Sequence, residues 1–232
     1  MMPIGDDNSL NTVRPYVNYA LILANILVFV FLQGLGANEA FTLSYSTVPQ
    51  EILTGQDVTG GPAGLLPTPI PVYGTLISSM FMHGSIAHIG GNLLYLWIFG
   101  DNLENRMGHG KYLVFYILCG LIASLSQVML NKTTGYGLLI PNLGASGAIS
   151  GVLGGYLMLF PKNKVRVIAL NFITTVPAIV SLGIWIALQI FSGYGARNNE
   201  GGGVAYAAHI GGFVAGLILA KFFANRVQQQ VM

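Results

Sequence analysis

The sequence predicts an all-α integral membrane protein with six transmembrane helices, and three observations lead to this prediction. Hydrophobic residues make up 53% of the 232 positions and charged residues only 8%, whereas soluble domains carry about 25% charged residues. Apolar stretches near the length that crosses a hydrocarbon core of about 30 Å recur along the chain. Basic residues are unevenly divided between the connecting segments, as in multi-pass proteins of fixed orientation. The net charge of +2 gives no reason to expect nucleic acid binding.

Six apolar segments are the predicted spans, at residues 17–33, 86–103, 111–130, 145–160, 165–191 and 205–224. The second and fourth are short, and the fifth is long with Pro177 inside it. The helical domain is therefore expected at 16–226, after a short polar segment 1–15 and before a tail 227–232. Segment 1–15 lacks the basic and then apolar build of a cleaved signal peptide. Residues 34–85 form a long loop, of the kind that is often functional.

The basic residues predict the orientation of these spans. With six spans, most of them fall on one side of the membrane, namely Arg14, Arg106, Lys111, Lys162, Lys164, Arg166, Lys221 and Arg226. Only Lys132 and Arg197 fall on the other side. Because cytoplasmic loops are enriched in Lys and Arg, both termini are expected in the cytoplasm and the 34–85 loop outside.

A few polar residues lie within or beside the spans, where ionisable groups are costly and often functional. His83 and His88 flank the start of the second span, and His209 lies in the sixth. Asn92 follows His88 by four residues and so shares its helix face. His109, in contrast, is expected to be a solvated loop residue.

Three polar residues on three different spans are expected at the same depth in the membrane. At 1.5 Å per residue, His88, Ser146 and His209 each lie about 20 Å above the cytoplasmic boundary, in the outer half of the bilayer. The fourth span is too short to cross the whole core, so irregular backbone must precede Ser146, and such backbone needs protein or a water-filled cavity around it. Small residues at every fourth position favour close packing of the fourth and sixth spans; they are Gly147, Gly151, Gly155, Gly212 and Gly216.

This set of side chains is suited to serine hydrolase chemistry. His209 is a candidate base for the Ser146 hydroxyl, which is a poor nucleophile on its own. No carboxylate falls at their depth, so the pair would act as a dyad whose imidazole is held by packing or another hydrogen bond. His88, Asn92 and the Ser146 amide are candidate donors for an oxyanion hole, the last because a helix N-terminus leaves its first amides free.

Other interpretations of the same residues stay open at this point. A serine at a helix start is often a cap, and Asn92 could simply join two helices. A proton or ion pathway through the histidines is the main alternative to a hydrolase. A metal site is disfavoured because the chain has no His-Glu-x-x-His motif and no carboxylate ligand at that depth.

Four motifs resemble those of the rhomboid family of intramembrane serine proteases. They are Gly144-Ala145-Ser146-Gly147, Ala208-His209-Ile210-Gly211-Gly212, the run from His83 through His88 to Asn92, and Glu104-Asn105-Arg106-Met107-Gly108. They occur in the family's order, and the similarity covers about residues 15–225. One position departs from it, because some rhomboids have a tyrosine that packs on the catalytic histidine where this chain has Ser150.

The resemblance implies a six-helix rhomboid-like bundle that cleaves transmembrane segments of other proteins. It implies Ser146 as nucleophile, His209 as base, and His88, Asn92 and the Ser146 amide as oxyanion hole. His83, Gly144 and Gly147 would have supporting roles, and the 192–203 loop would help to gate substrate access. The expected partners are transmembrane substrates and the lipid bilayer, with no metal, cofactor or nucleic acid.

Two rivals to this interpretation are kept. A pseudoprotease of the same family would bind membrane clients without cutting them, although such proteins typically lack the Ser or the His. A channel or transporter would use the histidines as a proton relay. The absence of a transit peptide or extra domains favours a prokaryotic plasma membrane, and neither the substrate nor the oligomeric state can be deduced from the sequence.

Overall fold

The computed structural model describes residues 1–61, 64–170, 172–196 and 204–225. Its main elements are β1 (Met2–Asp6), α1 (Tyr16–Leu27), α2 (Glu39–Tyr45), α3 (Pro49–Thr54), α4 (Thr75–Ser78), α5 (Ile86–Met107), α6 (His109–Thr134), α7 (Ser146–Leu159), β2 (Lys164–Ala169), β3 (Phe172–Pro177), α8 (Ala178–Ala196) and α9 (Tyr206–Phe223). A π-helical turn, Val28–Leu32, continues α1, and 3-10 turns lie at Gly34–Gly36, Val72–Gly74 and Ser79–Phe81. The protein is therefore mostly helical.

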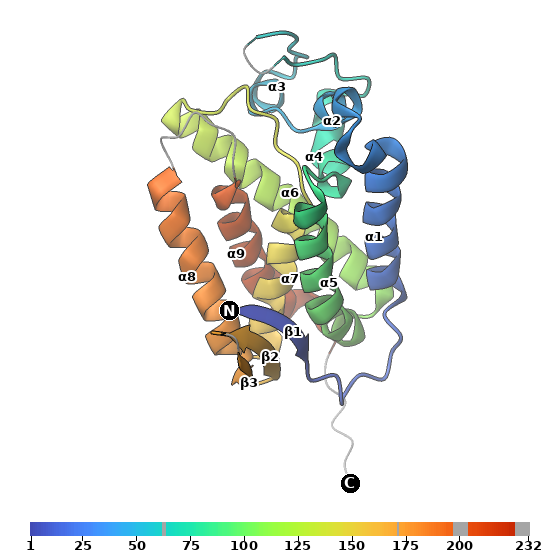
Figure 1. The fold of residues 1–232 in the computed structure, drawn as a ribbon, viewed down its shortest axis with the longest axis vertical. Helices are drawn as coiled ribbons and strands as arrows, with labels where there is room; N and C mark the ends of the chain where they lie inside the picture. The colour runs from blue at the N-terminus through green and yellow to red at the C-terminus, as the bar shows by residue number, and fades with distance from the viewer. Residues whose placement is uncertain (62–63, 171, 197–203, 226–232) are drawn as a thin grey trace.

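Helix α7 lies in the middle of the bundle, with α5, α6 and α9 around it and α8 at one edge (Figure 1). Its first ten or so residues are almost all buried. The packing with α9 is backbone against backbone. A Cβ built on Gly212 would come 2.1 Å from the Gly147 carbonyl oxygen, and one on Gly216 would come 1.9 Å from that of Gly151. The close approach predicted from the glycine spacing is present. We call this contact of α7 with α9 the seam, and no residue larger than glycine fits at Gly212 or Gly216.

Within the described residues, three helices are long and apolar enough to cross a membrane, at His109–Thr134, Ala178–Gly195 and Tyr206–Phe223. Shorter apolar helices lie at Tyr16–Leu32, Val72–Phe81 and Ser146–Leu159. The protein is thus a multi-pass integral membrane protein, while the count of six spans and the cytoplasmic position of the termini stay predictions. Helix α5 is longer than the predicted second span, because it continues to Met107.

The predicted fifth span at 165–191 is wrong in its first half. Lys164–Ala169 and Phe172–Pro177 are the paired antiparallel strands β2 and β3, and the helix begins only at Ala178. Charged and apolar residues alternate along β2, and β-branched residues dominate β3, a pattern that favours strands. Pro177 cannot occupy a helix interior, because it lacks the amide hydrogen, so it precedes α8 instead of interrupting it.

The N-terminal segment, predicted only as a short polar stretch, contributes a third strand. Strand β1 pairs antiparallel with β2, with Met2 opposite Ile168 and Asp6 opposite Val165. The resulting sheet lies beside the end of α7 and has the order β1-β2-β3 (Figure 1). The end of α9 is at the same end of the bundle, where the Asn225 amide donates to the Arg106 carbonyl over 3.0 Å.

The described residues of the 34–85 loop lie at the opposite end of the bundle and include α2, α3 and α4 (Figure 1). They support the irregular backbone that leads into α7. Thr47 and Asn142 exchange backbone hydrogen bonds of 2.9 and 2.8 Å, and the Gly144 amide donates to the Ser79 carbonyl over 2.9 Å. The non-helical backbone expected before Ser146 is therefore present and is covered by protein. The predicted gating loop, 192–203, falls largely outside the described residues, and the tail 227–232 wholly so.

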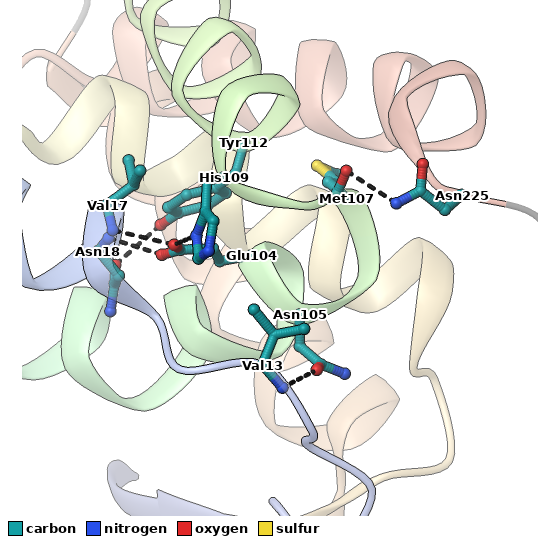
Figure 2. A network of polar contacts seen from close by, with 9 residues as sticks. All are labelled: Val13, Val17, Asn18, Glu104, Asn105, Met107, His109, Tyr112 and Asn225. Carbon is teal, nitrogen blue, oxygen red and sulfur yellow. Dashed lines mark hydrogen bonds and ion pairs between the residues drawn. The ribbon is translucent and has the colours of Figure 1, made fainter.

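A buried carboxylate joins α1 to α5 (Figure 2). Helix α1 begins without a side-chain cap of its own. Glu104, which is fully buried, accepts instead from the amides of Val17 and Asn18 over 2.9 and 2.7 Å. His109, predicted to be a solvated loop residue, is exposed as expected, but it is the first residue of α6 and not part of a loop. Its ring also contacts the Glu104 carboxylate. The carboxylate therefore satisfies amides that a helix start leaves unpaired.

Candidate functional site

Ser146 is the first residue of α7, and the backbone before it is held in a glycine conformation. Gly144 has φ +130°, which side-chain-bearing residues rarely adopt. A Cβ at Gly144 would also lie 3.0 Å from the His88 ring and 3.5 Å from the Ser146 hydroxyl oxygen. Glycine at this position therefore lets the Ser146 hydroxyl and the His88 imidazole approach each other closely.

His209 lies on the first turn of α9, and its ring reaches Ser146. The distance from His209 Nε2 to Ser146 Oγ is 2.8 Å. The seam of α7 and α9 sets this distance, since the two backbones touch at Gly147 and Gly212. Gly147 directly follows Ser146, and Gly212 lies about one helical turn after His209. The structure thus brings together the two residues that the sequence suggested as nucleophile and base, within hydrogen-bond reach.

The other ring nitrogen of His209 has a partner that the sequence analysis missed. His209 Nδ1 lies 2.7 Å from Oε1 of Gln189, which is on α8. An amide oxygen only accepts, so Nδ1 carries the proton and Nε2 is left to accept from the Ser146 hydroxyl. No sequence signal singles out Gln189, because it lies in the apolar segment of the predicted fifth span and because the usual third group is a carboxylate.

The packing partner of His209 also comes from α8. The Trp185 ring lies 6.1 Å from the His209 ring, centroid to centroid, at an interplanar angle of 35°, and Tyr206 makes an edge contact at 6.4 Å. Ser150, which stands where some rhomboids have a tyrosine, instead donates to the Ser146 carbonyl over 2.6 Å. Aromatic contact with the imidazole is therefore supplied by other residues.

His88 and Asn92 lie on the α5 face toward Ser146, and both line the same cavity as the serine. The Gly84 amide donates to His88 Nδ1 over 3.3 Å, so in the neutral ring Nε2 carries the proton and can donate. The amide nitrogen of Asn92 is buried and has no hydrogen-bond partner among the described residues. Both donors are free to bind an oxygen in the cavity.

His83 is fully buried just before α5. Neither of its ring nitrogens has a hydrogen-bond partner in the described part of the chain. Its ring packs edge-on against Phe29 and His88, at 6.4 and 5.1 Å. The side chain of Gln33 accepts from the His83 amide and donates to its carbonyl, over 2.9 and 3.0 Å. These contacts fit the supporting role predicted for His83, since they fix the chain that leads to His88.

Ser146, His209, His88 and Asn92 share a cavity of about 630 Å³. Cavities of this size hold a ligand or a peptide segment together with several waters. In the described ranges no group of three or more His, Cys, Asp or Glu side chains is placed to hold a metal ion. The arrangement places a serine hydroxyl, an imidazole that can accept its proton, and N–H donors around one space, which is the set of groups that acyl transfer requires.

The sequence is similar to one protein family and to several of its known members. The family model of the Rhomboid domain matches residues 72–226. Rhomboid protein 1, mitochondrial, of Saccharomyces cerevisiae is 32% identical over 158 residues, which are 67% of this chain and 43% of that protein. Rhomboid protease GluP of Bacillus subtilis is 30% identical over 148 residues, covering 62% of this chain and 25% of that protein.

A third relative is the human presenilin-associated rhomboid-like protein, mitochondrial, which is 27% identical over 151 residues. That alignment covers 61% of this chain and 36% of the human protein. This chain thus spans less than half of the length of each of these relatives. The match of the family model contains Ser146, His209, His88 and Asn92 together with the helices that carry them.

Proposed function

The chain belongs to the rhomboid family, and we propose that it is an intramembrane serine endopeptidase that cleaves transmembrane segments of other membrane proteins. The observation that carries this proposal is the 2.8 Å contact between Ser146 Oγ and His209 Nε2. The name of the relative GluP, a rhomboid protease, supports the same activity.

In the proposed mechanism, Ser146 Oγ attacks the carbonyl carbon of the scissile peptide bond while its proton passes to His209 Nε2. The tetrahedral oxyanion accepts hydrogen bonds from the Ser146 amide, His88 Nε2 and the Asn92 side chain. The imidazolium then gives its proton to the leaving amine, and an acyl-enzyme on Ser146 remains. Water from the cavity, activated by the same imidazole, attacks this ester and releases the second product.

Preorganised backbone around Ser146 supports this mechanism. The amides at the start of α7 are the ones that a helix leaves unpaired, and the helix dipole favours negative charge there. Gly144 allows the chain to turn into α7 without a side chain between Ser146 and His88. The donors are thus in position before charge develops, which is the most effective form of electrostatic stabilisation.

The proposal includes the topology expected from the sequence. Six spans with both termini in the cytoplasm would place the cavity in the outer half of the bilayer, open to segments arriving from the lipid. The described ends of the chain lie at the same end of the bundle, which fits an even number of spans (Figure 1). The relatives do not support the prokaryotic plasma membrane expected from the sequence, because two of those named above are mitochondrial and one is bacterial. A prokaryotic plasma membrane stays a prediction.

A binding-only member of the family is the second candidate function, and the cavity could hold a client helix without chemistry. The Ser146–His209 contact argues against it, because a protein that only binds has no need of a serine hydroxyl on an imidazole nitrogen. A proton relay is disfavoured because the ring of His209 is engaged on both sides by the neutral groups of Ser146 and Gln189.

The test is cleavage of a fluorescently labelled transmembrane substrate in liposomes. The wild type should release labelled fragments, and Ser146→Ala and His209→Ala should each lose this activity. Ser126→Ala is the matched control, because among the described residues that hydroxyl bonds only to the Ile122 carbonyl of its own helix. Cleavage that persists in Ser146→Ala would overturn the proposal. Co-purification of the substrate with an inactive wild type would favour the binding-only alternative.

A further inference from the structure

We propose that Gln189 is the positioning residue of the dyad, an uncharged third member supplied by α8. This inference rests on the proposed function. Its basis is the 2.7 Å contact of Gln189 Oε1 with His209 Nδ1, on the opposite side of the ring from Ser146. One acceptor and one nucleophile thus fix both ring nitrogens of a single imidazole.

The contact selects the tautomer that the reaction needs. Because Gln189 accepts the Nδ1 proton, Nε2 has its lone pair directed at the Ser146 hydroxyl. During attack the Ser146 proton moves to Nε2, and the Nδ1 proton stays hydrogen-bonded to Gln189 throughout. Without that acceptor the imidazole can rotate or adopt the other tautomer, in which Nε2 cannot take a proton. In a serine triad a carboxylate performs this role.

A neutral acceptor suits the surroundings of this site. An unpaired carboxylate buried among apolar helices is costly, whereas an amide can be held there at lower cost. The other polar neighbours of His209 in the described residues are Ser146 from α7, His88 from α5 and Tyr206 from its own helix. Among the described residues, no Asp or Glu carboxylate forms a hydrogen bond or ion pair with His209.

Gln189 also links the base to the position of α8. Trp185 lies one helical turn before Gln189, so the two face α9 together and both contact the His209 ring. The residues on the outer side of α8 are exposed, among them Ile184 and Leu188 at 41% and 55%. A shift of α8 away from α9 would remove the acceptor and the aromatic contact at once, while leaving Ser146 and His209 on their own rigid helices.

The experiment compares Gln189→Leu and Gln189→Ala with Gln189→Glu, in which an acceptor oxygen is retained. Leu188→Ala on the exposed side of α8 is the control. Removal of the acceptor should lower kcat roughly 10- to 100-fold with little change in KM, because substrate binding does not use this contact. Gln189→Glu should recover most of the lost kcat, and Leu188→Ala should behave as wild type.

A second readout needs no substrate. The rate at which a fluorophosphonate probe modifies Ser146 should fall in Gln189→Leu and recover in Gln189→Glu. The inference is overturned if Gln189→Leu keeps the wild-type kcat and probe rate, since a packing role alone would produce that pattern. It is also overturned if Gln189→Glu, which has the same shape and an acceptor oxygen, fails to restore what Leu removes. If the wild type still cleaves and Ser146→Ala is inactive in those cases, the proposed function is retained and only the role of Gln189 is rejected. If the wild type neither cleaves nor reacts with the probe, the proposed function and the role of Gln189 are both rejected.

Discussion

Helices α7 and α9 pack tightly against each other at the seam, whereas α8, at the edge of the bundle, packs loosely around Gly183. In the seam, Gly212 and Gly216 of α9 have no room for a side chain, because a Cβ would lie 2.1 and 1.9 Å from the carbonyl oxygens of Gly147 and Gly151 on α7. On α8, a Cβ at Gly183 would meet nothing within 4 Å. The hydroxyl and the imidazole are carried by the tight pair, and the acceptor that orients the imidazole is carried by the loose helix.

This difference separates two requirements of the site. The distance between Ser146 Oγ and His209 Nε2 must be constant, and backbone contact between two helices is the most rigid way to fix it. Orientation of the ring needs only one hydrogen bond and one aromatic contact, which a helix at the edge of the bundle can supply. Breaking the seam should therefore destroy the site, whereas changes on α8 should weaken it in steps.

The largest effect is expected from Gly216→Ala. The new methyl group would overlap the Gly151 carbonyl, whose oxygen lies 1.9 Å from the ideal Cβ position, so the two helices must separate. A misplacement of about 1 Å between reacting groups can cost roughly 100-fold in rate. We expect a loss of cleavage of at least this order, measured with the labelled substrate in liposomes.

Gly183→Ala is the matched control for the seam, because it adds the same methyl group to a transmembrane helix where space is open. It should keep wild-type cleavage and thermal stability. Equal activity of Gly216→Ala and Gly183→Ala would contradict the view that the seam sets the distance between Ser146 and His209.

A second comparison uses Glu104, which fastens α1 to the core (Figure 2). Glu104→Ala leaves the part-buried amide of Val17 and the buried amide of Asn18 without their acceptor, which should cost about 2–4 kcal/mol of stability. Asn105→Ala removes an acceptor from the Val13 amide at the surface and should cost about 1 kcal/mol or less. Thermal unfolding in detergent should rank Glu104→Ala well below Asn105→Ala. The reverse order would show that α1 is held by apolar packing instead.

The smallest effect concerns the docking of β1 and depends on pH. Asp6 accepts from the Tyr156 hydroxyl and the Asn102 amide over 2.6 and 2.7 Å. Burial raises the pKa of Asp6 from 3.8 to about 7, and the nearby Asp101 and Asp7 add to the effect, against the hydrogen bond from Tyr156. Because the docked strand binds the proton more tightly, docking is most stable below pH 3.8 and weakens as pH rises towards 7.

Asp6→Asn tests this sign, because an amide imitates the protonated acid. Hydrogen exchange of the β1 amides should be several-fold slower in Asp6→Asn than in wild type at pH above the shifted pKa. At a pH well below it the two proteins should exchange alike. Faster exchange of Asp6→Asn at high pH would mean that the ionised carboxylate holds the strand, contrary to this account.

The sequence was sufficient for the parts of the fold that depend on apolar length and small-residue spacing. The fourth and sixth predicted spans, 145–160 and 205–224, match α7 and α9 within a residue or so. The fixed rise per residue of a helix also predicts that Ser146, His209 and His88 lie at the same depth in the bilayer. These are local rules, and they hold in a membrane because backbone groups there must be paired within the helix.

The incorrect or missing predictions concern residues whose structure depends on contacts with segments that are distant in the sequence. The prediction of a helix before Pro177 is wrong because hydropathy does not distinguish an apolar strand from part of a span. In addition, one of the two strands that pair with β2 is Met2–Asp6, near the other end of the chain. Gln189 was overlooked for a related reason, since only the packing of α8 on α9 turns an ordinary glutamine into a neighbour of His209. The functional roles of Ser146, His209, His88 and Asn92 remain predictions until they are tested.

The most direct test of the central claim is to identify where a fluorophosphonate probe attaches to the detergent-solubilised protein, by mass spectrometry of wild type and His209→Ala. The account predicts an adduct on Ser146 in the wild type, with a rate of formation at least roughly 100-fold lower in His209→Ala because the base is missing. An adduct on a different serine, or equal modification of Ser146 in both proteins, would contradict the assignment of a nucleophile activated across the seam of α7 and α9.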